Sequence, residues 1–324
     1  MSRRLELFVL PVALLAAATG TVFYVFVGGS RLSFDRELEW SIGIYQGPSL
    51  DRLAPHTQVS NPVLTARDVT DVSASFVADP FMVNYEGTWY MFFEVMSRLS
   101  QHGEIGLAVS PNGIDWTYRN IVLDEPFHLS FPFILKYRDS WYMVPESATA
   151  DGVRLYRTQK FPDGWRYVRT LVKGEYSDSV LFQYRNQWWL LTCGTPRKHN
   201  ELRLFTAESL TGSFTEHPAS PVVRNNGNKA RPAGRVLIYD GIPIRFAQDS
   251  YPTYGKRVHA FGITSLNSSS FIEESLFPHP VIESGEESWN RHGMHHVDPH
   301  KTGAGTWVAC VDGYRKFAVL RLEY

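Results

Sequence analysis

Hydrophobic and polar positions along the chain follow a repeated hairpin pattern. The stretch "VADPFMVNYEGTWYMFFEV", residues 77–95, has an apolar strand, a polar Tyr-Glu-Gly turn and a second apolar strand. The same pattern recurs at residues 129–147, 176–194, 230–250 and 295–314. Successive hairpins, measured from Asp79, Phe131, Asp178, Arg231 and Asp298, are 52, 47, 53 and 67 residues apart. A period of this length is typical of the blades of a β-propeller.

The residues after each hairpin repeat as well. Residues 103–116, 152–165, 201–214 and 257–271 each contain a strand, a turn rich in small and polar residues, and an aromatic residue that opens another strand. Four strands in each of five units predict an all-β, five-bladed β-propeller over residues 40–324. We expect "FAVLRLEY" (317–324) to give the fifth blade a third strand and "WSIGIYQG" (40–47) to give it a fourth, which closes the ring. A β-sandwich or two small β domains would leave the five-fold repeat unexplained.

An apolar segment precedes the predicted propeller. Residues 7–27 carry no charge over 21 positions, which is long enough for one transmembrane helix. Arg3 and Arg4 lie before it, so we expect a cytoplasmic N-terminus and a propeller on the periplasmic, lumenal or extracellular side. The alternative is a signal peptide cleaved after Ala16-Ala17-Ala18. The predicted organisation is an anchor or signal peptide (1–30), a linker (31–39) and the propeller (40–324).

Composition limits the function and the covalent chemistry. Lys and Arg number 32 against 33 Asp and Glu, a balance that does not favour nucleic-acid binding. Cys193 and Cys310 are the two cysteines. In an exported compartment they can form a disulfide or remain as two buried thiols, but two cysteines are not a disulfide framework.

The repeat is expected to gather acidic side chains at one end of the propeller axis. Each blade supplies a residue at the start of its first strand, namely Asp79, Phe131, Asp178, Arg231 and Asp298. Each also supplies one on the return strand, namely Glu94, Glu146, Cys193, Gln248 and Asp312. Six of these ten are carboxylates, and crowded carboxylates shift one another's pKa values, which separates acid from base roles. Paired carboxylates cleave glycosides, although acids at strand ends can also serve only to cap turns.

The fourth blade carries a second set of candidate binding residues. They are Arg231, Arg235, Gln248, Asp249 and Tyr254. An arginine fork suits a carboxylate or a phosphate, which suggests an acidic sugar or a phosphorylated glycolipid. Without a ligand, we expect Arg231 to bind Asp178 or Asp298; the alternative is a purely structural pair between blades. Arg98 follows Glu94 on a loop that we expect to overhang the site.

Histidines precede the fifth hairpin. "RHGMHHVDPH" (291–300) places His296, Asp298 and His300 at alternate positions, which share one face of a strand. This trio is a candidate site for a divalent ion such as calcium, although calcium prefers oxygen ligands. The alternative is that these side chains, with His295, bind sugar hydroxyls or fix neighbouring carboxylates.

Two resemblances extend these expectations. "ADPF" and the later "GEIGLAVSPNGIDW" resemble the first blade of glycoside hydrolase family 43 propellers. That resemblance implies Asp79 as general base, Asp178 as a group that orients substrate and tunes a pKa, and Glu146 as general acid.

The second resemblance covers more of the chain. "FPFILKYRDSWYMVPES" (131–147), "RPAGR" (231–235) and "RFAQDSYPTYG" (245–255) resemble the N-terminal propeller of glucosamine inositolphosphorylceramide transferases and free-standing bacterial relatives. It implies surface glycan or glycolipid metabolism. The expected function is a glycosidase-like enzyme acting on a cell-surface polysaccharide or glycolipid. The alternative is a non-catalytic glycan-binding or assembly protein working beside a glycosyltransferase.

Overall fold

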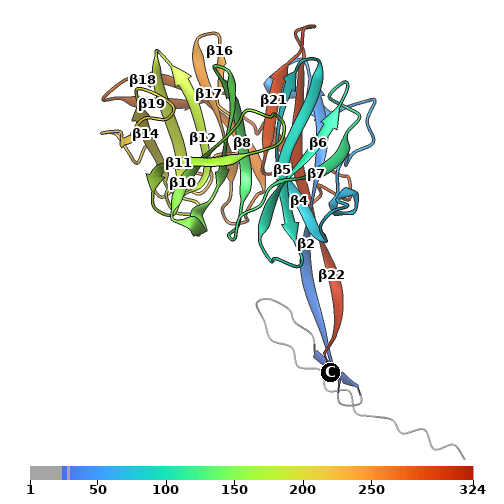
Figure 1. Ribbon diagram of the computed structural model, residues 1–324. Helices are drawn as coiled ribbons and strands as arrows, with labels where there is room; N and C mark the ends of the chain where they lie inside the picture. The colour runs from blue at the N-terminus through green and yellow to red at the C-terminus, as the bar shows by residue number, and fades with distance from the viewer. Residues whose placement is uncertain (1–23, 28–29, 324) are drawn as a thin grey trace, which may run out of the picture. The chain divides into compact units, whose positions relative to one another are not determined.

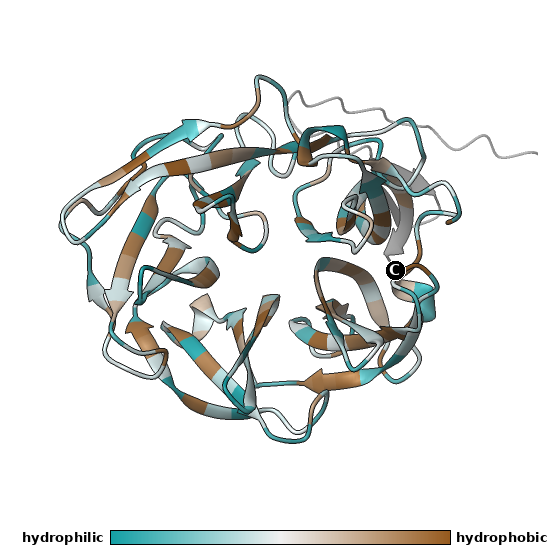
Figure 2. Ribbon diagram, turned by 90° about the horizontal axis from the view of Figure 1, so that it is seen from above, coloured by the Kyte–Doolittle hydropathy of each residue, from teal (hydrophilic) through white to brown (hydrophobic). Residues whose placement is uncertain are grey.

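The computed structural model describes residues 24–27 and 30–323, and the side chains of residues 37–319. Contacts divide the chain into two units, one formed by Trp40–Arg315 and the other by Met1–Glu39 with Lys316–Tyr324. Within the first unit, five antiparallel sheets stand around a central axis (Figure 2). The predicted all-β, five-bladed propeller is therefore confirmed.

Four blades consist of strands that follow one another in the sequence (Figure 1). Blade one contains β4 (Ala74–Tyr85), β5 (Thr88–Ser97), β6 (Gly103–Ser110) and β7 (Thr117–Leu123). Blade two contains β8 (Ser130–Tyr137), β9 (Ser140–Glu146), β10 (Gly152–Thr158) and β11 (Arg166–Lys173). Blade three contains β12 (Ser177–Tyr184), β13 (Gln187–Cys193), β14 (Leu202–Ala207) and β15 (Thr215–Glu216). Blade four contains β16 (Leu237–Tyr239), β17 (Ile242–Asp249), β18 (Arg257–Leu266), β19 (Phe271–Ser275) and β20 (Ile282–Glu283).

The fifth blade joins the two ends of the propeller sequence. Its order is β21 (Val297–Lys301), β22 (Trp307–Glu323) and β2 (Ser30–Gly47), and β3 (Ala54–Pro55) pairs with β2. The segment "FAVLRLEY" continues β22, so the expectation that it forms a separate third strand is wrong. Residues 40–47 take the third place instead and close the ring as the last main strand of the blade. The predicted linker, residues 31–39, lies within β2.

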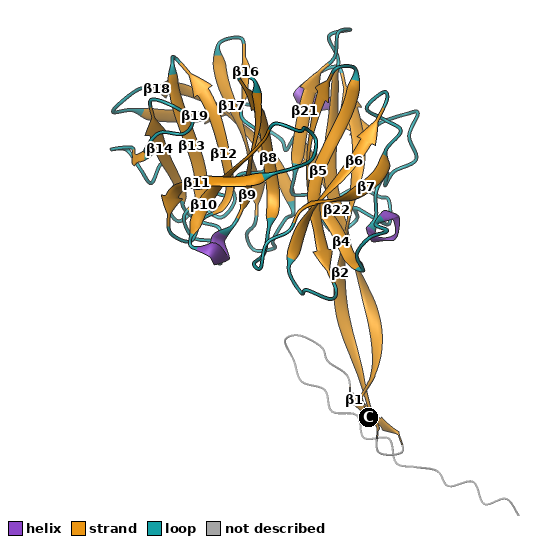
Figure 3. Ribbon diagram, in the orientation of Figure 1, coloured by secondary structure: helices purple, strands orange, loops and turns teal. Residues whose placement is uncertain are grey.

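The remaining described elements are short. Of the predicted membrane segment 7–27, residues 7–23 lie outside the described residues, and β1 (Tyr24–Val27) pairs with the first residues of β2. Described helix is limited to the 3-10 turns η1 (Leu50–Arg52), η2 (Ala66–Asp68) and η3 (Ala148–Ala150) (Figure 3). None of the described helices has the length and apolar character needed to cross a bilayer.

The core lies between neighbouring blades. The inner strands are buried in nearly continuous runs, as in β4 and β5, because each blade packs both faces against its neighbours. Aromatic rings fill these contacts; Tyr90 of blade one lies edge to face against Phe161 of blade two, with ring centroids 4.8 Å apart. Cys193 and Cys310 are both buried free thiols, which excludes the disulfide alternative.

The first strands of blades one to three share an unusual backbone feature. Asp79, Phe131 and Asp178 have φ of 53°, 45° and 50°, the left-handed region that non-glycine residues seldom adopt. At each of them the pairing with the return strand shifts register, as in a β-bulge. In blade five the pairing runs without a break from Val297 to Lys301.

Closure of the ring by β2 can be tested at Ile44, whose side chain is fully buried. Ile44→Ala removes apolar contacts and leaves a cavity, so we expect the free energy of unfolding to fall by about 2–5 kcal/mol. Urea denaturation measures this loss. The control is Ile272→Ala in β19, where the side chain is 53% exposed and the expected change is below about 1 kcal/mol. Equal effects for the two variants would show that β2 contributes no more than a surface position.

Candidate active site

The strand-start bulges and the return strands meet at the end of the axis opposite the hairpin turns. Asp79 donates its backbone N–H to Asp312 Oδ2 over 3.0 Å, and its own Oδ2 accepts the N–H of Phe131 over 3.2 Å. The N–H of Asp178 is bound in the same way by Glu146 Oε2, at 3.2 Å. Each bulge amide therefore binds a carboxylate from the preceding blade. The bulges and the carboxylates form a network of two hydrogen-bonded groups, one that joins Asp312, Asp79 and Phe131 and one that joins Glu146 and Asp178.

Arg231 lies in this network and binds Asp178. Its Nε and Nη2 donate to the two oxygens of Asp178 over 2.5 and 3.1 Å, and Nη2 lies 3.4 Å from Glu146 Oε2. Gln248 Nε2 adds a third hydrogen bond to Asp178, at 2.7 Å. Of the two partners expected for Arg231 in the absence of ligand, the structure places Asp178 there and holds Asp298 elsewhere.

Histidines and aromatic residues surround the carboxylates. His295 Nδ1 lies 2.8 Å from Asp312 Oδ2, and its Nε2 lies 3.7 Å from Asp79 Oδ1. Trp40 stacks on the His295 ring with centroids 4.0 Å apart. The guanidinium of Arg231 lies 5.3 Å from the ring centroid of Tyr254.

Three neighbours of the cluster were not predicted. His128 Nε2 lies 3.5 Å from Glu94 Oε1, and His199 Nδ1 lies 2.9 Å from Arg231 Nη1. Trp40 is the third. All three lie outside the repeated hairpins, so the periodicity of the sequence held no signal for them.

The pKa values divide the carboxyl groups into two classes. Burial, reinforced by neighbouring carboxylates, raises the pKa of Glu94 and of Glu146 well above the ordinary value and raises that of Asp79 to about 7. Burial also opposes ionisation of Asp178 and Asp312. There the Arg231 guanidinium and the His295 ring outweigh burial, and both pKa values are lowered.

One predicted member of the strand-start ring lies elsewhere. Asp312 accepts a backbone hydrogen bond from His295 and from His296, so its neighbour on the first strand is His296 rather than Asp298. Asp298 pairs with Cys310, one step further toward the turns than the repeat predicts. It binds Arg235 there, with Nη2 2.9 Å from Oδ2, and His300, at 3.1 Å. Arg235 and Asp298 thus leave the predicted cluster.

Two other predicted binding residues also lie apart from the carboxylates. Asp249 is buried and its nearest charged partner is Arg257, at 3.1 Å. Arg98 is exposed, and its Nε donates to the carbonyl of Ala74 over 3.0 Å. The bonds recorded for these two side chains all lie outside the cluster.

The predicted metal trio is not brought together. His300 binds Asp298, whereas His296 Nδ1 faces Asp79 Oδ1 at 3.9 Å. A different group, Asp79, His295 and Asp312, has ligand atoms within 4.8 Å of one another. The nitrogen in this donor set and the internal hydrogen bond from His295 to Asp312 fit calcium poorly.

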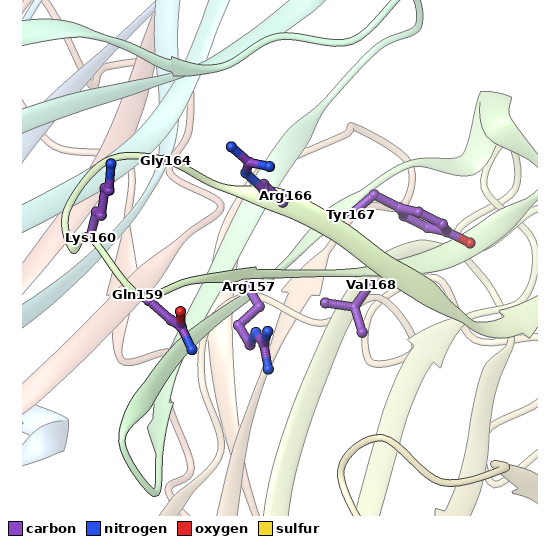
Figure 4. A pocket seen from close by; sticks show the side chains of 7 residues that line it. All are labelled: Arg157, Gln159, Lys160, Gly164, Arg166, Tyr167 and Val168. Carbon is purple, nitrogen blue, oxygen red and sulfur yellow. The ribbon is translucent and has the colours of Figure 1, made fainter.

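Solvent reaches the cluster through a few side chains. Glu146 and Arg231 keep 13% and 11% of their side-chain surface exposed, and His128 keeps 34%. A separate groove lies on the outer strands of blade two. It has a volume of about 490 Å³ and is lined by Arg157, Gln159, Lys160, Gly164, Arg166, Tyr167 and Val168, on β10, β11 and the turn between them (Figure 4).

The fold is that of the five-bladed propellers found among glycoside hydrolases and glycoside phosphorylases. The β-1,2-mannobiose phosphorylase of Listeria innocua superposes with a TM-score of 0.60 over 83% of this chain and 96% of its own, at 12% identity. A thermostable family-43 glycoside hydrolase superposes with a TM-score of 0.56 over 82% of this chain and 96% of its own, at 11% identity.

The sequence assigns the chain to a family within that fold. The family model described as glucosamine inositolphosphorylceramide transferase 1, N-terminal, matches residues 33–314, and the chain belongs to this family. It is 34% identical to glucosamine inositolphosphorylceramide transferase 1 of Oryza sativa subsp. japonica over 329 residues, which cover 93% of this chain and 44% of the relative. The chain thus spans less than half the length of this curated relative. Both predicted resemblances are confirmed.

The raised pKa of Glu94 predicts a pH-dependent stability. The folded protein keeps Glu94 protonated above about pH 4.3, where the unfolded carboxyl ionises. Stability should therefore fall as pH rises from there toward the folded pKa, by up to about 1.4 kcal/mol per pH unit. Glu94→Gln cannot ionise, so its free energy of unfolding should exceed that of the parent more at pH 8 than at pH 5.

Urea denaturation at the two pH values measures this difference. The matched control is Glu208→Gln, which replaces an exposed glutamate outside the cluster. The same pH dependence in Glu94→Gln and the parent would contradict the prediction.

Proposed function

We propose that the carboxylate cluster is the active site of a glycosidase-like enzyme that acts on a cell-surface polysaccharide or glycolipid. The observation that carries the proposal is the division within one cluster, where burial raises the pKa of Glu146 while Arg231, which binds Asp178, lowers the pKa of that carboxyl group. Glycoside cleavage needs such a division, because one carboxyl group must donate a proton while another acts as base or nucleophile.

Glu146 is the proposed general acid. Burial and the nearby Asp178 carboxylate raise its pKa well above the ordinary value, which favours the protonated form that an acid needs. Its side chain keeps 13% exposure, against 7% for Asp79 and 1% for Asp178. Of the three proposed catalytic carboxyl groups, it is therefore the most accessible to the oxygen of a leaving group.

Asp79 is the proposed general base. Its Oδ2 holds the amide of Phe131, whereas Oδ1 has no hydrogen-bond partner among the described residues. A pKa of about 7 allows Oδ1 to take a proton from an attacking water near neutral pH. The nearby His295 opposes the effect of burial and keeps this pKa from rising further.

Asp178 is the proposed orienting group. The carboxyl groups of Glu146 and Asp178 are hydrogen-bonded to one another. That contact is shorter than the separation of about 5 Å or more that two carboxyl groups need to act across a glycosidic bond. The proposed catalytic pair is therefore Asp79 and Glu146. Asp178 and Arg231 control the protonation of Glu146.

The family supports the proposed ligand, because its name couples glucosamine with inositolphosphorylceramide. We extend the proposal to a glycosyltransferase partner and to a propeller held at the exported face of a membrane by residues 7–27.

A non-catalytic glycan-binding or assembly protein is the second candidate. It is favoured by the hydrogen bonds that Asp79 and Asp178 already make within the protein, which are those of carboxylates that brace neighbouring blades. The two candidates predict different effects on hydrolysis when the Asp79 carboxylate is removed.

Asp79→Asn separates them. If Asp79 is the base, hydrolysis should fall by roughly 10²–10⁴-fold while binding of the same compound changes little. Release of nitrophenol from a panel of 4-nitrophenyl glycosides, with and without phosphate, measures turnover, and calorimetry measures binding. Asp139→Asn, in the exposed β8–β9 turn, is the control. Parent protein that binds glycosides but turns over none of the panel would support the binding protein and refute the enzyme.

Arg231→Lys tests the orienting role. Lysine keeps the charge but cannot hold both oxygens of Asp178, so the proton on Glu146 is less well defined. We expect ligand binding to weaken markedly, and the acid limb of the pH–rate profile to move, in a protein that remains folded by circular dichroism. An unchanged profile with normal binding would refute the role. Loss of folding would assign Arg231 to a structural pair between blades.

A further inference from the structure

A second cavity lies at the opposite end of the propeller axis. It has a volume of about 760 Å³ and is lined by residues of the hairpin turns and nearby strands of blades one, two, four and five, among them Asn84, Trp89, Lys136, Trp141, Arg235 and His300. In blades one and two the turns are closed by the pairs Tyr85–Thr88 and Tyr137–Ser140, whereas Glu94 and Glu146 pair at the far ends of the same hairpins. The cavity and the carboxylate cluster are therefore at different ends of the axis.

Asp298 holds two of the lining side chains, Arg235 and His300, by hydrogen bonds. Its carboxylate is fully buried and accepts hydrogen bonds from both Arg235 Nε and Nη2, from the backbone N–H of Met82 at 2.8 Å, and from His300 at 3.1 Å. Arg235 and His300 keep 15% and 22% side-chain exposure. They are held in place and still reach the cavity.

The cavity has an excess of positive charge. Its lining includes Lys136, Arg235 and Lys301 and no aspartate or glutamate. The buried Asp298 balances Arg235. The two lysines lie over aromatic rings, with Nζ 4.4 Å from the centroid of Tyr85 and 4.9 Å from that of Tyr239. No ion pair is found for either lysine within the described part of the chain.

Indole rings and amides supply the other half of a carbohydrate site. Trp89 meets His300 edge to face, with centroids 5.5 Å apart, and Trp141 is stiffened by its stack on Phe161. The side chains of Asn84 and Asn112 line the same cavity. Rigid apolar surfaces with a few polar groups are the usual composition of a small-molecule site, and the volume is in the usual range.

We propose that this turn-end cavity binds a small anionic carbohydrate, a sugar that carries a phosphate or a carboxylate. Lys136, Arg235 and His300 receive the anionic group, and Trp89 provides a surface for the sugar ring. This inference is independent of the proposed glycosidase-like chemistry, because no residue is shared between the two sites.

Four probes test the proposal, with the full chain in low-salt buffer and calorimetry or tryptophan fluorescence as readout. They are glucose 6-phosphate, glucuronate, neutral glucose and inorganic phosphate. We expect glucose 6-phosphate or glucuronate to bind at least tenfold more tightly than glucose and than inorganic phosphate, with affinity falling as salt is added. Whichever of these two anionic probes binds more tightly identifies the preferred anionic group as a phosphate or as a carboxylate.

Variants locate the binding. Lys136→Ala, at an exposed side chain, should weaken binding by roughly tenfold without affecting the fold. Lys160→Ala, in the blade-two groove of Figure 4, should leave it unchanged, as should Asp79→Asn at the carboxylate end. If Asp79→Asn still binds the probes, binding at the turn-end cavity does not depend on whether the carboxylate cluster is an active site.

Four results would overturn the proposal. The first is equal binding of glucose and its anionic counterparts. The second is equal binding of inorganic phosphate and glucose 6-phosphate, which would mark a simple anion site. The third is a loss in Lys160→Ala that matches the loss in Lys136→Ala. The fourth is failure of all four probes to bind at millimolar concentration.

Discussion

The burial of five carboxyl groups around two cations is the constraint on which the carboxylate end of the propeller depends. A buried charge is tolerated only where it is paired and hydrogen-bonded. Arg231 and His295 can compensate two charges, and the groups they contact, Asp178 and Asp312, are the two whose pKa values are lowered. The others, Asp79, Glu94 and Glu146, have raised pKa values. Charge balance thus sets the protonation pattern that acid–base chemistry would use.

The left-handed bulges meet this constraint with backbone groups. A non-glycine residue with positive φ costs of order 1–3 kcal/mol, and here three successive blades contain one. Each bulge points its amide at a carboxyl group of the blade before it, so backbone strain is offset by hydrogen bonds to buried carboxyl oxygens. The same bonds join blade five to one, one to two, and two to three. Hydrogen bonds of the cluster thus also connect neighbouring blades of the ring.

The sequence predicts the parts of this design that repeat locally. Each hairpin closes on itself, so period and polarity were enough to find all five blades and to place Asp79, Glu94, Glu146 and Asp178 together. A bulge adds one residue to a strand without changing its apolar character. The hydrophobic pattern therefore could not show that blade five lacks one, and Asp298 was placed one step too near the cluster. The loop residues His128 and His199 are fixed by tertiary contacts alone, which no periodicity contains.

The register of blade five contributes to a chemical difference between the two ends of the axis. With a bulge, the strand-start residue turns into the carboxylate cluster, as Asp79 and Asp178 do. Without one, Asp298 points to the next layer, where it holds Arg235 and His300 toward the hairpin turns. Asp298 is therefore absent from the carboxylate cluster, which already has more acids than cations. It holds cationic side chains at the turn-end cavity instead, whose lining has no acid. The register of blade five thus adds to the chemical difference between the two ends of the axis.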